Sequence, residues 1–159
     1  MANWRDPGPG GFYDDLGDPA NSPHLDHEPS TTEDPLFARA TFQGFALRTD
    51  WPVAWRQYSQ TYYDAPLLMR YDGLDPSATY KLRVTYSGDS PKARMRLEAD
   101  GTVIHDLFVK PDPVRSVEFA LPKTLTTDGK LGLKWNQEPG RGGNGRGCQV
   151  AEVWLIRVE

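Results

Sequence analysis

The clearest pattern in the chain is an alternation of apolar and polar residues from Tyr80 to Ser87. A period of two residues is typical of a β-strand with one face on a core and the other in water. The face toward the core would carry Tyr80, Leu82, Val84 and Tyr86. This stretch therefore predicts a strand in the centre of a β-sheet fold.

The segment before this strand has the composition of a turn. It contains Asp72-Gly73 and Asp75-Pro76. Both dipeptides favour a turn, because Gly tolerates a positive φ and Pro fixes φ near the value that a turn requires. The spacing of Leu74, Pro76 and Tyr80 predicts a tyrosine corner, in which the tyrosine hydroxyl bonds the backbone just upstream. Such corners are typical of Greek-key sandwiches.

Further short apolar or alternating stretches are bounded by turn residues. They predict strands over residues 39–48, 67–71, 93–99, 102–109, 114–121, 130–136 and 148–158. Asp100-Gly101, between two of them, favours a type I′ hairpin turn. Seven to nine strands, with no long amphipathic helix, predict an all-β fold: a two-sheet antiparallel β-sandwich of jelly-roll type.

Two segments lie outside this pattern. Residues 1–38 are poor in aliphatic residues, so we expect a loop-rich N-terminal segment, with at most one short strand or helical turn, that packs on a sandwich domain of residues 39–159. Phe12, Tyr13 and Leu16 would anchor it. Residues 50–66 hold two Trp and three Tyr between prolines, and they predict an aromatic-rich loop at one end of the sandwich.

Composition restricts the partners and the chemistry. The 159 residues suffice for one domain, and the net charge of −4 argues against nucleic acid, whose binders present a basic surface. No apolar run is long enough to span a membrane. The single cysteine, Cys148, excludes an internal disulfide, and its strand-like surroundings predict a buried, inert thiol. The Pro/Gly-rich start leads us to expect a domain of a larger secreted or periplasmic protein.

Residues 73–88 (GLDPSATYKLRVTYSG), a strand pair around Ala99-Asp100-Gly101, and a closing strand with the sequence QVAEVWLIRV resemble the galactose-binding-domain-like β-sandwich. The resemblance covers roughly residues 39–159. Modules of this type are commonly attached to bacterial glycoside hydrolases and other polysaccharide-degrading enzymes. The resemblance implies a carbohydrate-binding or accessory role, often with a structural calcium ion, although a fold alone does not define a ligand.

The aromatic segment supplies the first candidate ligand site. Its rings are Trp51, Trp55, Tyr58, Tyr62 and Tyr63, and Asp50, Arg56 and Asp64 lie near them in sequence. Sugars pack their C–H faces on flat rings while polar side chains bond their hydroxyls, so Trp51, Trp55, Tyr62 and Tyr63 are predicted to bind a glycan. The alternative is that most of these rings pack in the core or at an interface, where large aromatic side chains usually lie.

The glycine-rich loop of residues 139–147 supplies the second candidate. Arg141, Asn144 and Arg146 are donors suited to sugar hydroxyls or to a uronate carboxylate. The loop lacks the Lys-Ser/Thr ending and the strand-to-helix context of a phosphate-binding P-loop. The alternative is a flexible hairpin with solvated arginines.

Acidic residues supply a candidate metal site. Asp14, Asp15 and Asp18 lie close together in sequence, and Glu152 lies on the closing strand. Calcium prefers six to eight oxygen ligands, but no EF-hand spacing is present, and solvated turn carboxylates are the alternative. The segment His24 to Glu28 is bracketed by prolines, so we interpret it as a solvent loop and not as a metal site.

No sequence signature of a serine, cysteine or zinc hydrolase is present. The predicted function is therefore a non-catalytic carbohydrate-binding module that works beside a catalytic domain. One alternative is a ligand-free structural domain that packs against such a catalytic domain. Another is a small hydrolase or lyase with two carboxylates brought together by the fold.

Overall fold

A computed structural model of the chain describes residues 5–26, 41–45, 53–62, 66–87, 94–111, 113–137 and 146–158. Its strands are β1 (Phe12–Asp15), β2 (Thr41–Phe45), β3 (Gln57–Tyr62), β4 (Leu67–Tyr71), β5 (Tyr80–Thr85), β6 (Arg94–Ala99), β7 (Thr102–Val109), β8 (Ser116–Ala120), β9 (Leu131–Gln137), β10 (Arg146–Val150) and β11 (Glu152–Arg157). One helical turn, α1 (Val53–Arg56), and two 3-10 turns, η1 (Pro19–Asn21) and η3 (Lys123–Thr126), complete these segments. The prediction of an all-β fold is confirmed.

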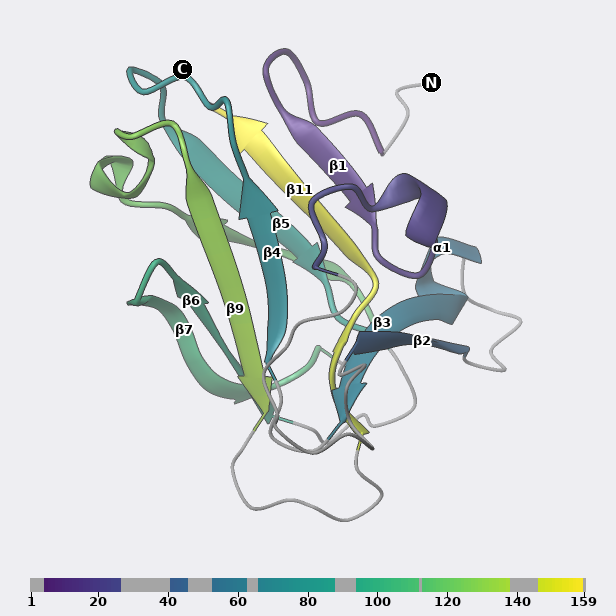
Figure 1. Ribbon diagram of the computed structural model, residues 1–159. Coiled ribbons are helices and arrows are strands. Elements are labelled where there is room, and N and C mark those ends of the chain that lie inside the picture. The colour runs from purple at the N-terminus through teal and green to yellow at the C-terminus, as the bar shows by residue number, and fades with distance from the viewer. Residues whose placement is uncertain are drawn as a thin grey trace.

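Two four-stranded antiparallel sheets form the sandwich (Figure 1). One has the order β1-β11-β5-β8 and the other the order β4-β9-β6-β7. A three-stranded sheet, β10-β3-β2, adjoins them and was not predicted. The antiparallel sandwich is therefore confirmed, with an additional small sheet.

The alternating positions form the core between the two larger sheets. On β5, Leu82 and Val84 are fully buried, as are Leu97 on β6 and Trp135 on β9. Each fully buried aliphatic side chain of this kind contributes roughly 1.5–3 kcal/mol to folding. The inward faces predicted for β5, β6 and β9 are thus those that pack in the core.

The two predicted turns have the expected geometry. The Asp75 backbone N–H donates to the Tyr80 hydroxyl at 3.0 Å, which is the tyrosine corner. Asp100 and Gly101 have φ values of 46° and 84°, as a type I′ turn between β6 and β7 requires.

The closing segment differs from the expectation of one strand. It divides at Ala151 into β10, which pairs with β3, and β11, which pairs with β1 and β5. Cys148 has a positive φ of 51° at an irregular register in β10, and this bulge redirects the chain. The thiol is fully buried, as predicted.

The N-terminal segment contributes a strand of its own. β1 pairs with β11 at the edge of a four-stranded sheet, with Phe12 opposite Leu155 and Asp15 opposite Glu152. Leu16, one of the predicted anchors, is fully buried in the core. The domain boundary at residue 38 stays a prediction, because residues 27–40 lie outside the described residues.

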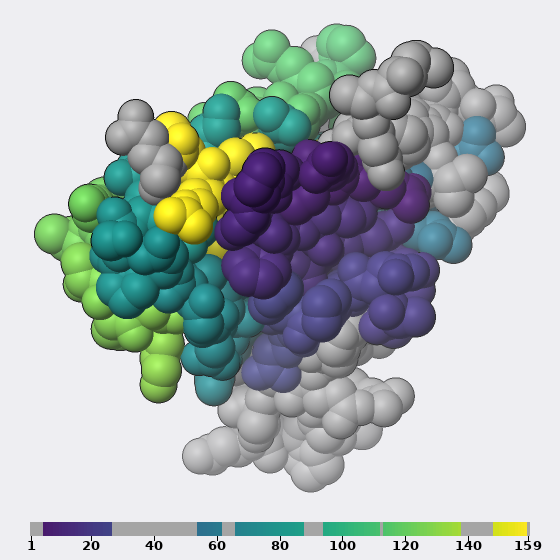
Figure 2. Space-filling model, turned by 90° about the horizontal axis from the view of Figure 1, so that it is seen from above, coloured from purple at the N-terminus to yellow at the C-terminus, as the bar shows by residue number. Residues whose placement is uncertain are grey.

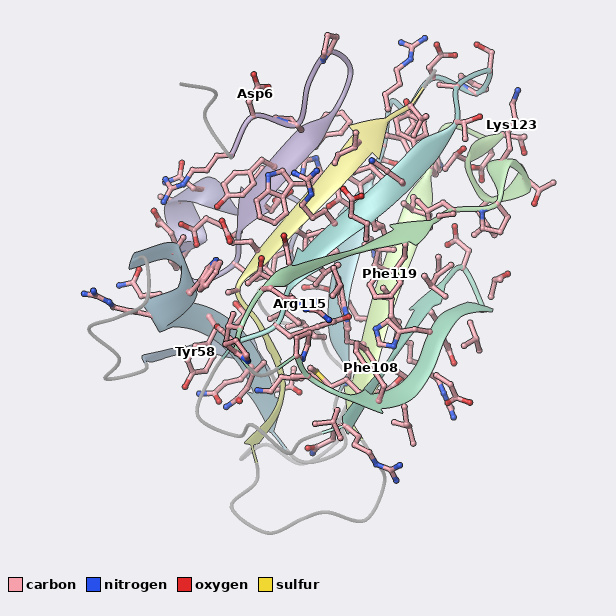
Figure 3. All side chains as sticks on the ribbon, turned by 180° about the vertical axis from the view of Figure 1, so that it is seen from behind. Asp6, Tyr58, Phe108, Arg115, Phe119 and Lys123 are labelled. Atoms are coloured by element: carbon pink, nitrogen blue, oxygen red, sulfur yellow. The ribbon has the colours of Figure 1, made fainter. Side chains whose placement is uncertain are left out.

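At the opposite side of the sandwich, the edge strands β7 and β8 direct Phe108 and Phe119 into the space between the sheets (Figure 3). His105 packs against both rings, with centroid distances of 4.4 and 4.9 Å. The Trp135 indole N–H donates to the Tyr86 oxygen at 2.8 Å, and the Tyr86 hydroxyl contacts His105 Nε2 at 2.6 Å.

The tautomer of His105 follows from this chain of hydrogen bonds. Its Nδ1 lies 2.9 Å from the Asp106 carbonyl oxygen, which can only accept, so Nδ1 carries the proton. Nε2 is then the acceptor for the Tyr86 hydroxyl. Burial lowers the pKa of His105 below its usual value, so this residue is a neutral structural link between the sheets.

Candidate functional site

The N-terminal segment forms a polar pocket on the surface beside β11. The pocket has a volume of about 430 Å³ and is lined by Arg5, Tyr13, Asp15, Ala20, Asn21 and Pro23. Figure 2 shows this segment, in purple, as a continuous part of the surface next to the yellow C-terminal strand. The pocket therefore combines one strand, β1, with the loop before it and the turn after it.

A capped 3-10 turn holds one wall of the pocket. Asp18 precedes η1, and its Oδ1 accepts from the Ala20 backbone N–H at 3.0 Å. Its Oδ2 accepts from the Asn21 side-chain amide at 2.6 Å. Pro19 follows the cap, where its fixed φ suits the start of a turn. The sequence Asp-Pro-Ala-Asn thus positions Asn21 at the pocket.

Asp15 is the most unusual group in the pocket. The residue is 8% exposed, and its Oδ1 is buried without a hydrogen-bond partner among the described residues. The Arg5 guanidinium lies 4.0 Å from its other oxygen. Burial raises the pKa of Asp15 to about 6; Glu152 and Asp18 raise it further, while Arg5 and a backbone N–H lower it.

Glu152 lies behind the pocket and is fully buried. The Tyr13 hydroxyl donates to its Oε2 at 2.6 Å, and the Trp55 indole N–H donates to its Oε1 at 2.7 Å. Burial, with the neighbouring carboxylate, raises the pKa of the Tyr13 hydroxyl far above its usual value, so Tyr13 remains a donor. The two aromatic side chains are therefore fixed by one carboxylate.

Two side chains contact the Tyr13 ring. Arg5 lies over it with 5.9 Å between the guanidinium carbon and the ring centroid, and the Trp154 ring lies 5.1 Å away. An Arg side chain, a carboxylate, an amide and a fixed aromatic ring thus meet at one pocket. Together they can donate and accept hydrogen bonds with a small hydroxyl-rich ligand.

The predicted glycan-binding residues are only partly described. Trp51, Tyr63, Arg141 and Asn144 lie outside the described residues, and of the side chains of Tyr62 and Arg146 nothing is described. The backbones of Tyr62 on β3 and Arg146 on β10 are register partners, so these two candidates from distant segments meet in one sheet. Their role in binding stays a prediction.

The aromatic segment is not simply a loop. Residues 57–62 form β3, and Tyr58 is 1% exposed, so for this ring the core alternative is correct. Trp55 is half-buried in α1 and bound to Glu152. The sequence predicted a loop here because a strand buried on both faces shows no alternation of apolar and polar residues.

The structure does not gather the four carboxylates predicted for calcium. In the described part of the chain, no three His, Cys, Asp or Glu side chains are placed to hold an ion. Asp14 points to the opposite side of β1 from Asp15 and accepts from the His24 backbone N–H at 3.0 Å. Asp18 caps η1. Calcium therefore stays a prediction without geometric support from these residues.

The interpretation of residues 24–28 as a solvent loop is wrong for its first two residues. The His24 ring stacks on Tyr71 at 4.3 Å and bonds Asp14 through Nδ1 at 2.8 Å. Leu25 is 4% exposed and forms a β-bridge with Met69. This segment covers the edge of β4.

Sequence reasoning missed Arg5 and Asn21 as site residues. The available signal was the N-cap pattern of residues 18–21, which predicts a turn that follows β1 closely. Arg5 carries no comparable signal, because only the folded N-terminal loop brings it to Asp15.

No protein-family model matches the chain, and a search of curated proteins finds no match. Solved structures are similar in fold. The extracellular domain of ANXUR1 from Arabidopsis thaliana matches with a TM-score of 0.63 and 12% identity over 93% of this chain and 42% of that chain. β-Glucuronidase 2 from Bacteroides uniformis, covalently bound to cyclophellitol-6-carboxylate aziridine, matches with a TM-score of 0.59 and 7% identity over 94% of this chain and 18% of that one.

The GH26-CBM35 β-(1,4)-mannanase of Podospora anserina matches with a TM-score of 0.51 and 11% identity, over 94% of this chain and 28% of that chain. In all three, the chain spans less than half of the similar protein. The resemblance to the galactose-binding-like β-sandwich is thereby confirmed at the level of the fold. No helix in the described residues is long and apolar enough to cross a membrane.

Proposed function

We propose that the chain is a non-catalytic carbohydrate-binding module and that the pocket formed by β1, the loop before it and the turn after it binds a sugar unit. The observation that carries the proposal is a polar pocket of about 430 Å³ at which a carboxylate, a guanidinium and an amide meet, those of Asp15, Arg5 and Asn21. Arg5, whose side chain is 40% exposed, and Asn21 donate to hydroxyls of the sugar.

The fixed position of Tyr13 supports this role. Because Glu152 holds its hydroxyl and Arg5 and Trp154 contact its ring, Tyr13 loses little conformational entropy when a ligand binds in the pocket that it lines. The fold similarity to a mannanase that carries a carbohydrate-binding module, and to a β-glucuronidase, is consistent with a module that works beside a catalytic domain.

Two alternatives are less well supported by the described residues. A hydrolase needs two carboxylates that reach the substrate, but Glu152 is fully buried with both oxygens bonded to protein donors. A ligand-free packing domain needs a broad apolar patch. Within the described segments the exposed large apolar side chains are Val103, Val109 and Val158. Two of them lie at the two ends of β7 and the third lies after β11, so together they form no broad apolar patch.

The aromatic segment and the glycine-rich loop remain proposed contributors. Trp51, Tyr62, Tyr63, Arg141, Asn144 and Arg146 would extend the binding surface for a longer glycan. Trp55 is a less suitable test position than Trp51, because its removal also takes a donor from the buried Glu152.

The proposal is tested by affinity electrophoresis of the purified chain on soluble plant and microbial polysaccharides, with calcium and with a chelator. Retardation on a defined polymer is expected. Arg5→Ala/Asn21→Ala should abolish it if the pocket binds, whereas Trp51→Ala/Tyr63→Ala should abolish it if the aromatic segment binds. Lack of retardation on every polymer would contradict the proposal and favour the packing domain.

A further inference from the structure

A buried side chain on β1 holds the segment that forms one wall of the pocket. Resting on the proposed function, we propose that Asp14, which does not line the pocket, is a positioning residue: through His24 it holds residues 18–23 where they can bind a glycan. Two features carry this role. Both ends of the segment are fixed to the sandwich, and half of the residues that line the pocket lie between these ends.

Residues 18–23 are called the pocket wall here. Its pocket-lining residues are Ala20, Asn21 and Pro23, and the other lining residues belong to β1 and the loop before it. Asp18 caps η1, and its carbonyl oxygen accepts from the Ser22 hydroxyl at 2.9 Å. The wall is therefore held together by its own hydrogen bonds, and its position on the sandwich depends on its two ends.

The first end of the wall is fixed by the core. Leu16 is fully buried, and its backbone N–H donates to the Ala151 carbonyl oxygen at 2.9 Å. A Cβ at Gly17 would meet the backbone of Gln57, so the chain passes directly against the start of β3. None of these contacts involves Asp14, so this end should stay in place when Asp14 is replaced.

The second end is fixed by Asp14, whose side chain is fully buried. Its Oδ1 accepts from the His24 backbone N–H at 3.0 Å, and its Oδ2 lies 2.8 Å from the Nδ1 atom of the same residue. A carboxylate can only accept, so Nδ1 carries the proton. Because His24 directly follows Pro23, one carboxylate fixes the end of the wall. Asp14 does so from the face of β1 opposite to Asp15, which lines the pocket.

Contacts with β4 complete this attachment. The Asp26 backbone N–H donates to the Leu68 carbonyl oxygen at 2.9 Å, and the Arg70 backbone N–H donates to the His24 carbonyl oxygen at 2.8 Å. The His24 ring stacks on Tyr71 with 4.3 Å between centroids. None of these residues lines the pocket, so the two N–H groups can report on the attachment of the wall without touching the glycan.

The consequence is a coupling between the pocket and the bonds to β4. A glycan that bonds Asn21 binds best when the wall is attached, so binding should also stabilise the attachment, because a coupling free energy is reciprocal. Loss of the Asp14 bonds should lower the affinity by about tenfold, which lies within the usual range for coupled sites.

The experiment uses the ¹⁵N-labelled full chain and short oligosaccharides prepared from the polysaccharide that retards it. Asp14→Ala should lower the affinity by about tenfold. Asp14→Asn should lower it by less than about threefold, because the amide oxygen can accept from the His24 backbone N–H while the amide N–H donates to Nδ1 of the other His24 tautomer. Rescue by the amide is the result expected of a residue that acts through these two bonds.

Asp100→Ala is the matched control. Asp100 Oδ1 also accepts a backbone N–H from a distant segment, that of Gly132 at 3.1 Å, so its removal should destabilise the sandwich in a similar way. Asp100 does not line the pocket or contact the wall, and the affinity should be unchanged. Circular dichroism would confirm that all three variants are folded.

Amide hydrogen exchange separates positioning from a general loss of stability. In the unmodified chain, saturating oligosaccharide should slow exchange of the Asp26 and Arg70 N–H groups by about fivefold or more. The Val158 N–H, which donates to the Thr79 carbonyl oxygen at 2.7 Å beyond the end of β11, should be unaffected. A side chain with only a structural role would leave exchange at Asp26 and Arg70 independent of the oligosaccharide.

The results that would overturn this role leave the proposed function intact. They are an Asp14→Ala variant that binds as tightly as the unmodified chain, equal losses for Asp14→Ala and Asp100→Ala, or exchange at Asp26 that the oligosaccharide does not slow. If Arg5→Ala/Asn21→Ala binds as tightly as the unmodified chain, or if no polysaccharide retards the chain, the proposed function of the pocket fails and the role of Asp14 fails with it.

Discussion

The buried carboxylate of Glu152 gives the sharpest test of the structure behind the pocket. Its two oxygens accept from Tyr13 at 2.6 Å and from Trp55 at 2.7 Å. Glu152→Gln keeps the shape but offers one acceptor and one amide donor, so one of the two donors faces an N–H group. Loss of one charge-assisted bond costs about 1.5–3 kcal/mol, and the buried donor left without a partner costs about 1–3 kcal/mol.

Relief from burying a charge offsets part of this loss, so we expect Glu152→Gln to lower the free energy of unfolding by about 2–4 kcal/mol. For a chain of this length, each kcal/mol shifts the melting temperature by about 2–4 °C. Urea denaturation followed by far-UV circular dichroism measures the difference.

Glu118→Gln is the matched control. The side chain of Glu118 is 43% exposed on the same sheet and pairs with Arg83, so its loss should cost at most about 1 kcal/mol. Tyr13→Phe should lower the free energy of unfolding by about 1.5–3 kcal/mol. The double variant Tyr13→Phe/Glu152→Gln should lower it by less than the sum of the two single effects, because both changes affect the same hydrogen bond. Equal effects of the Glu152 and Glu118 variants would refute the buried arrangement.

Three further predictions concern the rest of the fold. Burial lowers the pKa of His105 in the folded state, so as the pH drops below about 6.5 the unfolded state takes up the proton before the folded state does, and the free energy of unfolding should fall. His105→Gln should reduce this loss in urea melts, and an unchanged pH profile would contradict the neutral link to Tyr86. Burial raises the pKa of the Cys148 thiol to about 12, so a thiol reagent at pH 8 should react only after unfolding, and rapid reaction of the native protein would contradict the burial. Gly17→Ala would place a Cβ against the backbone of Gln57 and should cost about 1–3 kcal/mol in a thermal melt, whereas an unchanged melting temperature would contradict this close approach.

Local patterns predicted much of the sandwich. The alternation that begins at Tyr80 identified β5 and its buried face, and the Asp100-Gly101 turn identified the β6–β7 hairpin. The tyrosine corner followed from the spacing of Leu74, Pro76 and Tyr80 alone. These features succeed because their physical causes lie within a few residues of one another.

Other elements depend on contacts far apart in the sequence. β3 is buried on both faces, so its residues do not alternate, and its aromatic composition suggested a loop. The division of the closing segment at Ala151 requires two different partner strands. Neither is visible in a local pattern.

The site was predicted in fragments. Asp15 and Glu152 were singled out together with Asp14 and Asp18 for a metal, and Trp55 for stacking on a glycan; both roles stay predictions. The pairing of β1 with β11 places Asp15 opposite Glu152, and Trp55 joins them from α1 through its bond to Glu152. Arg5 joins them only through the N-terminal loop, and no spacing in the sequence predicts that approach.

The most direct test of the central claim is the dissociation constant for the polysaccharide that retards the chain, compared between matched variants. Arg5→Ala/Asn21→Ala removes the two exposed donors of the pocket, and Arg70→Ala/Asn136→Ala removes the same residue types from β4 and β9. We predict at least a tenfold loss of affinity for the first variant and less than a twofold change for the second. Equal affinities of both variants and the unmodified chain would show that the pocket is not where the glycan binds.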